Sequence, residues 1–413
     1  MIMRTRNHSG ILLLAACIIF AVPAAGHADN LFRLFPEASL SGLYGDQINN
    51  KGGDFAGTLV AGFYLDYTSA ARYASLHYDT FAQLFAHNSQ YDRAGEGQFV
   101  RATDEENLSP TTHLRLDELY FRNSPTVAGI ATSNQGPELN AVAAELLLAN
   151  DQASINQFGA ELSHSWGRNW SSEIGVHQET FWGNGSNSNN NNINYGESIG
   201  IATEYHFSDR FALGPGYRFY DSRSTAPGQP DAETQWPFVK ASWQAMRNLY
   251  LEGMVGVLIS HVQGDSRQAV NPGGWGLLEY NLQRARLKLY GGQEPLLVSG
   301  LNGAGGITRF VRGAITYDFT QRLTGNVGAG FDELQANGQG IQQDAQLISW
   351  GVGLTDRVNK WLEAYVRFTQ LRRKLTNSRQ FLFTGSQYGR EGTGNYIVVG
   401  FNVSAEAFRW SWQ

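Results

Sequence analysis

The sequence contains almost no cysteine, little charge and no long apolar segment after its N-terminal region. Cys17 is the only cysteine among 413 residues, which excludes intrachain disulfides and cysteine-rich zinc sites. Asp, Glu, Lys and Arg make up 16% of the residues, whereas a soluble domain normally contains about 25%. Beyond the N-terminal region, no segment approaches the roughly 18 consecutive apolar residues of a transmembrane helix. A disulfide-stabilised domain and a helical membrane protein are therefore both disfavoured.

The N-terminus has the pattern of a secretory signal peptide. Two arginines precede an apolar segment at 11–25, and small residues suit cleavage just before Asp29. We therefore expect residues 1–28 to be a signal peptide and residues 29–413 to form the mature protein. A retained membrane anchor and lipoprotein processing at Cys17 are the alternatives.

What the sequence does contain is glycine, aromatic residues and a regular alternation. It has 47 glycines, and 12% of its residues are aromatic. From about residue 156 onward, apolar and polar residues alternate, as where Leu362, Ala364 and Val366 flank Glu363 and Tyr365. This period of two predicts strands with one apolar and one polar face. A soluble sandwich has the same period, so the alternation alone does not indicate a membrane protein.

The breaks between the predicted strands distinguish a membrane barrel from a soluble sandwich better than the alternation does. Short polar breaks, mostly flanked by aromatic residues, lie at 166–170, 207–211, 243–249, 319–323 and 355–361. Long polar breaks lie between them, at 183–194, 222–234, 264–273, 335–343 and 377–393. Short periplasmic turns that alternate with long extracellular loops, together with an aromatic girdle, are typical of outer-membrane barrels.

The number of strands in the predicted barrel is expected to be even. Thirteen runs follow residue 156, and earlier runs lie near 39–47, 55–69, 72–88 and 111–123. Because single-chain bacterial barrels favour even numbers, one further strand is required, and 138–150 is the candidate. We therefore predict an all-β fold, a single transmembrane antiparallel β-barrel of about 18 strands in the outer membrane, with 16 as the alternative.

The end of the chain has the pattern of a closing barrel strand with an interruption. Ile397, Val399, Phe401 and Val403 share one face. Phe408, Trp410 and Trp412 share a face that is out of phase with this one. The phase change predicts a bulge or break near Ala405.

If the apolar residues face lipid, a set of charged residues points into the barrel. The predicted lower belt is acidic and consists of Glu161, Glu173, Glu204, Glu252, Glu279 and Glu363, with Lys240, Arg286 and Lys288 among them. The predicted layer above it contains Arg218, Arg312 and Arg367. These charges either pair across strands to satisfy one another or form a filter for a polar solute.

Tyrosines and amides add a second expectation for the inner face. Tyr64, Tyr220, Tyr290, Tyr365 and Asn281 are predicted to point inward. Aromatic rings can stack on sugars and amides can bind hydroxyls, which favours a route for a saccharide. The alternative is that tyrosine suits any wet β surface.

No catalytic or metal-binding motif is present. The sequence lacks a Gly-x-Ser-x-Gly elbow, a phosphate-binding loop and a His-Glu-x-x-His motif. Nine histidines are scattered, mostly one to a strand. We therefore expect no catalytic residues, no metal and no cofactor, and the formal charge of −6 disfavours nucleic acid. An outer-membrane hydrolase that uses serine and histidine from distant strands remains an alternative.

Two hairpins carry a resemblance to a known group. Tyr205-His-Phe-Ser-Asp-Arg-Phe211 and Tyr317-Asp-Phe-Thr-Gln-Arg-Leu323 resemble those of porin-like β-barrels associated with exopolysaccharide and exosortase systems. The similarity covers roughly 156–413. It implies passage of exopolysaccharide or another polar saccharide across the outer membrane. The implied partners are outer-membrane lipid, barrel-insertion machinery and periplasmic export components. A general diffusion porin and an outer-membrane enzyme are the alternatives.

Overall fold

The chain folds entirely into strands in the part that the structure describes. A computed structural model describes residues 30–46, 53–87, 93–122, 152–184, 192–225, 230–264, 268–296, 306–336, 343–376 and 392–412. The strands are β1 (Asn30–Gly45), β2 (Asp54–Thr68), β3 (Arg72–Phe85), β4 (Arg93–Ser109), β5 (Thr112–Arg122), β6 (Gln152–Ser165), β7 (Trp170–Asn184), β8 (Asn192–Ser208), β9 (Phe211–Ser224), β10 (Ala232–Met246), β11 (Leu249–Val262), β12 (Gln268–Asn281), β13 (Ala285–Leu296), β14 (Gly306–Asp318), β15 (Leu323–Ala336), β16 (Gln343–Arg357), β17 (Leu362–Thr376), β18 (Gly392–Ser404) and β19 (Phe408–Trp412). Within these ranges, no helix is long and apolar enough to cross a membrane. The predicted signal peptide lies outside the described residues.

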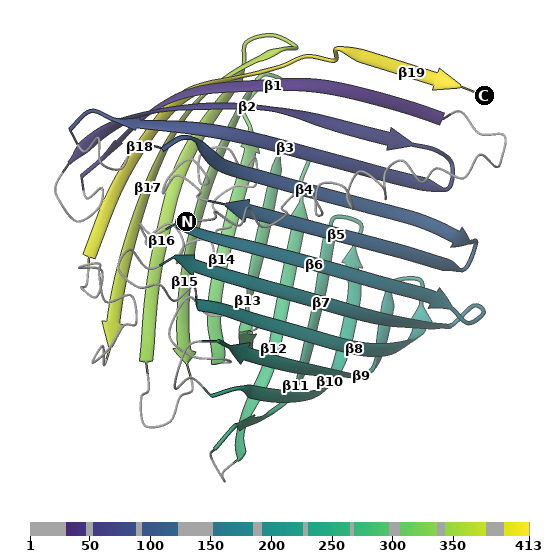
Figure 1. The fold of residues 1–413 in the computed structure, drawn as a ribbon. Coiled ribbons are helices and arrows are strands. Elements are labelled where there is room, and N and C mark those ends of the chain that lie inside the picture. Colours follow the sequence, from purple (N-terminus) through teal and green to yellow (C-terminus); the bar gives the residue numbers. More distant parts are fainter. Residues whose placement is uncertain are drawn as a thin grey trace, which may run out of the picture.

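The strands close into one antiparallel barrel (Figure 1). Each strand pairs with its neighbours in the sequence, and β1 pairs with β2 on one side and with β18 and β19 on the other. Since β18 and β19 both lie beside β1, they are two parts of one interrupted strand. The closed barrel therefore has 18 strands around its circumference, as predicted from parity, and closure removes every free sheet edge.

The fourth strand is not where the sequence pattern placed it. β4 lies between β3 and β5, and β5 pairs directly with β6, from Thr112↔His164 to Arg122↔Ser154. The prediction that 138–150 supplies the missing strand is therefore wrong, and that segment lies outside the described residues. The 93–109 sequence is rich in Gly, Glu and Asp. Because those residues are depleted in strands, the sequence pattern did not predict a strand there. The run at 111–123 consequently ascends toward the long loops, whereas the sequence pattern had it descending.

The turns alternate in length as predicted. The five predicted short breaks each join two paired strands, and Gly167 in the β6–β7 turn has φ of 82°, a left-handed conformation that glycine adopts without strain. Exposed aromatic side chains, including Trp166, Trp170, Phe207 and Trp361, flank these turns. They form the predicted girdle at the periplasmic membrane interface. The strands extend into the predicted long loops; β7, for example, ends at Asn184.

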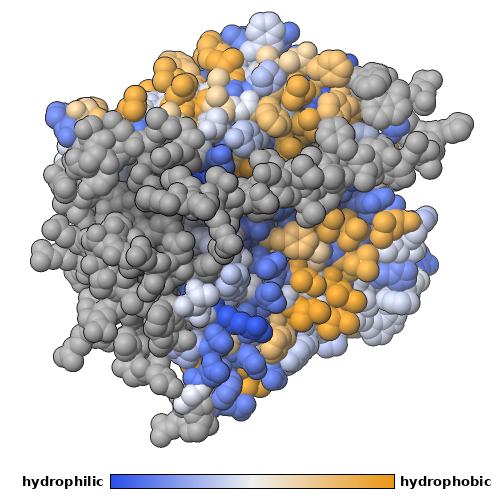
Figure 2. Space-filling model, in the orientation of Figure 1, coloured by the Kyte–Doolittle hydropathy of each residue, from blue (hydrophilic) through white to orange (hydrophobic). Residues whose placement is uncertain are grey.

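The outer wall is apolar. On most strands, alternate side chains are exposed and aliphatic or aromatic, as for Val255 with 69% of its surface exposed, next to Met254 with 7%. Figure 2 shows hydrophobic side chains gathered on the outer surface, with polar residues around them. Exposed apolar surface on this scale requires a lipid solvent. A closed barrel with such a surface belongs in the outer membrane, and the chain is an outer-membrane β-barrel.

The closing strand is interrupted where the sequence predicts. β18 ends at Ser404, opposite Glu37, and β19 begins with Phe408 opposite Leu34. Three residues, 405–407, thus lie opposite two on β1, 35–36, which is a bulge. Ile397, Val399, Phe401 and Val403 are exposed on the outer face before it, and Phe408 is exposed after it.

Candidate functional site

The inner wall carries the charged residues that the sequence singles out. On β11, Val255 and Val257 are exposed on the outer face, so Glu252 and Met254 point to the inside. The same alternation places the other predicted glutamates and arginines on the inner face of their strands.

One lysine and three glutamates meet on the wall formed by β7 to β11. The ammonium of Lys240 on β10 lies 3.1 Å from a carboxylate oxygen of Glu173 and 3.1 Å from one of Glu204. A carboxylate oxygen of Glu252 lies 3.8 Å away. The register explains this meeting, because Gly214 lies opposite both Lys240 and Glu204 and has no side chain to separate them. The lysine satisfies carboxylates that would otherwise be buried in part without a cation. We call Lys240, Glu173, Glu204 and Glu252 the lysine cluster.

Arg218 lies beside the lysine cluster. Its side chain crosses Gly200 on β8, where a Cβ atom would come within 2.9 Å of the Arg218 Nε. Glu161, Arg218 and members of the lysine cluster line a pocket of about 250 Å³, together with Phe238 and Trp275. Among the described residues, no carboxylate forms an ion pair with Arg218 within 4.0 Å. The pocket therefore offers a guanidinium, an acidic group and aromatic surface in one place.

The other predicted residues do not join this pocket. Glu279 forms an ion pair with Lys288 at 3.8 Å, and Glu363 forms one with Arg357 at 3.3 Å. Arg312 on β14 binds Asp332 on β15, whereas the Arg367 guanidinium lies over the ring of Tyr365 at 5.3 Å. The inner wall thus has separate charged groups around its circumference, and the predicted acidic belt is divided among several ion pairs.

The inner wall also carries apolar and aromatic side chains, of which only Tyr220 and Tyr365 were predicted to point inward. Trp236 and Leu258 are 0% exposed and pack with Tyr220, Phe238 and Met254. A second cluster contains Leu43, Ala56, Phe85, Tyr365, Leu371, Tyr396 and Val398. In the sequence, the only indication that these residues face inward is that they share their strand face with polar residues. They reduce the space inside the barrel.

Aromatic rings also follow one another on three adjacent strands. The rings of Trp275 on β12 and Tyr290 on β13 lie 5.7 Å apart, and those of Tyr290 and Phe310 on β14 lie 4.7 Å apart. We call Trp275, Tyr290 and Phe310 the aromatic series. Tyr290 was predicted to face inward, whereas its two neighbours were not singled out.

One serine and one histidine also meet on the inner wall. The Ser171 hydroxyl oxygen lies 2.9 Å from His206 Nε2. Nucleophilic catalysis by such a pair normally requires a third group that orients the histidine. In the described part of the chain, no carboxylate forms an ion pair with His206. The geometry therefore does not assemble a catalytic triad at this pair.

Comparisons with known proteins give matches among solved structures only. No protein-family model matches the sequence. No relative was found among curated proteins.

The solved structures that match include three proteins from two organisms. OccK2 (OpdF) of Pseudomonas aeruginosa is 13% identical, with 91% of this chain and 98% of that chain covered and a TM-score of 0.45. The outer membrane protein OpdK of the same organism is 13% identical over 91% and 99%, with a TM-score of 0.44. OccAB4 of Acinetobacter baumannii is 10% identical over 93% and 100%, with a TM-score of 0.44.

Proposed function

We propose that the chain is a passive outer-membrane channel for small polar solutes, and that the pocket beside the lysine cluster contacts them. The observation that carries the proposal is the charged inner wall of a closed barrel of 18 strands. Barrels of about 16 to 18 strands enclose an aqueous channel. Partly exposed charges on the inner wall are compatible with water in the lumen, since charges in a dry interior are costly. The chain is porin-like in this sense.

Small solutes are favoured over a polymer by the bulk of the inner wall. The cluster around Trp236 and the cluster around Tyr365 place large side chains inside the barrel. Side chains of this size narrow the lumen. A narrow lumen with charges of both signs suits solutes that carry several polar groups, because each group can be matched by a nearby side chain.

Passage of a saccharide, including the exopolysaccharide that the sequence resemblance implies, is the second candidate. The aromatic series supports it, because stacked or tilted rings on adjacent strands offer apolar faces at successive positions. Carboxylates of the neighbouring lysine cluster could accept hydrogen bonds from sugar hydroxyls.

Liposome swelling tests the proposal. The folded barrel, identified by its heat-modifiable migration, is reconstituted and exposed to isotonic solutions of a pentose, a disaccharide and a long dextran. We expect fast swelling with the pentose, slower swelling with the disaccharide and none with dextran. No swelling with any small solute would contradict a passive channel, and entry of dextran as fast as the pentose would favour polymer passage.

Two tryptophans on the same strand offer a matched pair for this assay. Trp236→Ala removes a side chain on the inner face of β10, whereas Trp243→Ala removes one from the outer face of the same strand. We expect the disaccharide to enter faster through Trp236→Ala and at the wild-type rate through Trp243→Ala. Equal rates in both variants would show that the Trp236 cluster does not restrict the lumen.

A further inference from the structure

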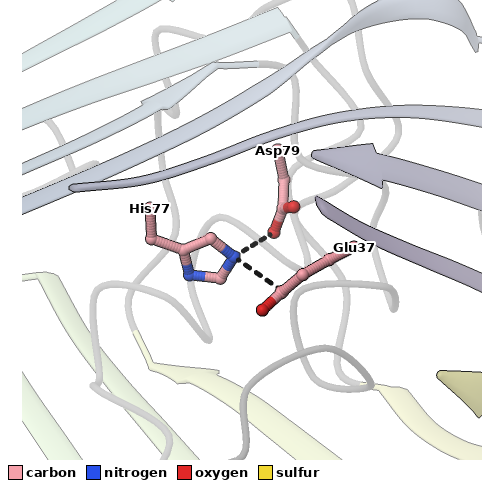
Figure 3. Close-up of side chains that lie close together, drawn as sticks. All are labelled: Glu37, His77 and Asp79. Atoms are coloured by element: carbon pink, nitrogen blue, oxygen red, sulfur yellow. Dashed lines mark ion pairs between the residues drawn. The ribbon is translucent and has the colours of Figure 1, made fainter. Parts of the chain in front are cut away.

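Three potential metal ligands meet on the inner wall beside the closure of the barrel. Figure 3 shows Glu37 from β1 and His77 and Asp79 from β3, with their side chains pointing toward one another. His77 Nε2 lies 3.1 Å from an oxygen of Asp79 and 3.4 Å from an oxygen of Glu37. One potential ligand atom from each of the three residues lies within 4.8 Å of the others. We call these three residues the seam triad.

The strand register builds this arrangement. Glu37 pairs with Gly62 on β2, and Gly62 pairs with Asp79 on β3, so the three residues form one row across the sheet. Adjacent strands lie about 4.8 Å apart, so β1 and β3 are separated by about 10 Å. The two carboxylates can approach each other only because Gly62 has no side chain between them. A Cβ atom at Gly62 would lie 2.1 Å from an oxygen of Asp79.

His77 completes the triad through the period of the strand. Residues two apart on a strand point to the same face, so His77 lies next to Asp79 on the inner wall. The rings of Phe99 and Tyr64 contact the imidazole edge-on, at centroid distances of 5.4 Å and 6.2 Å. Ser404 donates a hydrogen bond to the other oxygen of Glu37. These neighbours restrict the imidazole and one carboxylate before any ligand binds.

The carboxylates of the seam triad lack a lysine or arginine partner within the described ranges, although Arg101 lies opposite His77 in the register of β3 and β4. Other acids of the inner wall have such a partner, since Arg33 binds Asp66 with two hydrogen bonds of 2.9 and 2.8 Å, and Arg312 binds Asp332. Two partly buried carboxylates this close repel each other, and a single imidazole can neutralise only one of them.

The contacts of His77 are also unlike those of an ordinary hydrogen bond. Its Nε2 atom is buried and makes no hydrogen bond of normal geometry with a described residue, although both carboxylates are close. Metal bonds from nitrogen or oxygen are about 2.0–2.2 Å long. Ligand atoms at tetrahedral or octahedral angles around one ion are therefore about 3.0–3.5 Å apart. The two Nε2 to oxygen distances, 3.1 Å and 3.4 Å, fall in this range.

We propose that Glu37, His77 and Asp79 bind a divalent transition-metal cation of the Zn²⁺ type on the inner wall. One imidazole and two carboxylates are a ligand set that suits Zn²⁺ and its first-row neighbours. Three protein ligands leave at least one coordination position for water or for an anionic group of a solute. Binding of the ion does not depend on whether the barrel conducts.

The test uses Co²⁺ as a spectroscopic probe and Zn²⁺ as its competitor. The untagged, folded barrel in detergent is freed of metal with a chelator and titrated with Co²⁺. We expect one equivalent of Co²⁺ to bind per chain, with visible absorption bands from nitrogen and oxygen ligands, and to be displaced by one equivalent of Zn²⁺. No binding of Co²⁺ or Zn²⁺ up to millimolar concentration would overturn the proposal and leave His77 as a simple ion-pair partner.

Three variants locate the bound ion. We expect His77→Ala and Asp79→Asn to weaken Zn²⁺ binding by about tenfold or more. The matched control is His113→Ala, which removes an inner-wall imidazole that contacts an asparagine, Asn107, at 3.1 Å. It should bind like the wild type. Equal binding by all three variants would place the ion elsewhere and overturn the proposal; should His77→Ala fail to fold, Asp79→Asn, which keeps the side-chain shape, decides.

Discussion

Two walls of the same barrel handle their carboxylates in different ways. On the β7 to β11 wall, the ammonium of Lys240 reaches three glutamates, at 3.1, 3.1 and 3.8 Å. At the seam, Glu37 and Asp79 share only the imidazole of His77. The first group carries its own cation, whereas the second has two carboxylates and at most one weak cation. Neither group is neutral, since one has three carboxylates to one ammonium and the other has two carboxylates to one imidazole. The two groups differ in whether the compensating residue holds a permanent charge, and this determines what a passing ion encounters.

The largest expected effect comes from removing the cation of the lysine cluster. Lys240→Gln leaves three carboxylates close together, and breaking such a partly buried group should lower the free energy of unfolding by about 3 kcal/mol. Denaturant unfolding in detergent micelles measures this. The control is Lys288→Gln, since Lys288 is 42% exposed and lies 3.8 Å from Glu279, so its loss should cost less than about 1 kcal/mol. Equal losses would mean that the two walls do not differ as described.

The next largest difference in stability is expected between alanine variants of one glycine on each wall. Gly62→Ala places a Cβ atom 2.1 Å from both an Asp79 oxygen and the backbone oxygen of Tyr78, and the overpacking should cost about 1–3 kcal/mol. Gly200→Ala on the other wall places its Cβ 2.9 Å from the flexible end of Arg218, which can move. We expect a loss below about 1 kcal/mol there, measured in the same unfolding assay.

Zn²⁺ binding should also differ between the two glycine variants. Gly62→Ala should also weaken Zn²⁺ binding, because Asp79 must move away from Glu37, and Gly200→Ala should leave it unchanged. A Gly62→Ala barrel as stable as the wild type, with unchanged Zn²⁺ binding, would show that the row across β2 does not need this glycine.

The smallest effect is expected at a predicted member of the acidic belt that lies next to a turn. Glu363 binds Arg357 at 3.3 Å, and the arginine is 63% exposed. Because exposed ion pairs contribute about 0–1 kcal/mol, Glu363→Gln should leave the unfolding free energy nearly unchanged. A loss as large as that of Lys240→Gln would contradict the view that the belt consists of separate pairs.

Most of the architecture could be predicted from the sequence because strand periodicity and turn chemistry are local. The alternation along Leu362 to Phe368, the short turns and the break near Ala405 each depend on residues that are close together in the sequence. β4 could not be found in this way, because its sequence is rich in charge and glycine and its position is fixed by hydrogen bonds to β3 and β5.

The sites were harder to predict than the strands. Alternation assigns a residue to the inner or outer face, but it does not say which side chains meet across strands. The lysine cluster depends on register among β7 to β11, and the seam triad joins residues that are 42 positions apart at their widest, Glu37 and Asp79. The spacing of His77 and Asp79, two apart on one strand, was the one local signal for the seam triad.

The reversal potential under a KCl gradient tests the central claim, that charged groups of the inner wall contact the ions that pass. The folded barrel is inserted into a planar bilayer, and the wild type is compared with the Glu173→Gln, Glu204→Gln double variant. We predict a conducting wild type and a shift of the double variant toward the chloride equilibrium potential, because the lysine cluster then holds one lysine and one glutamate in place of one lysine and three glutamates. A barrel that does not conduct, or a reversal potential that both proteins share, would contradict it.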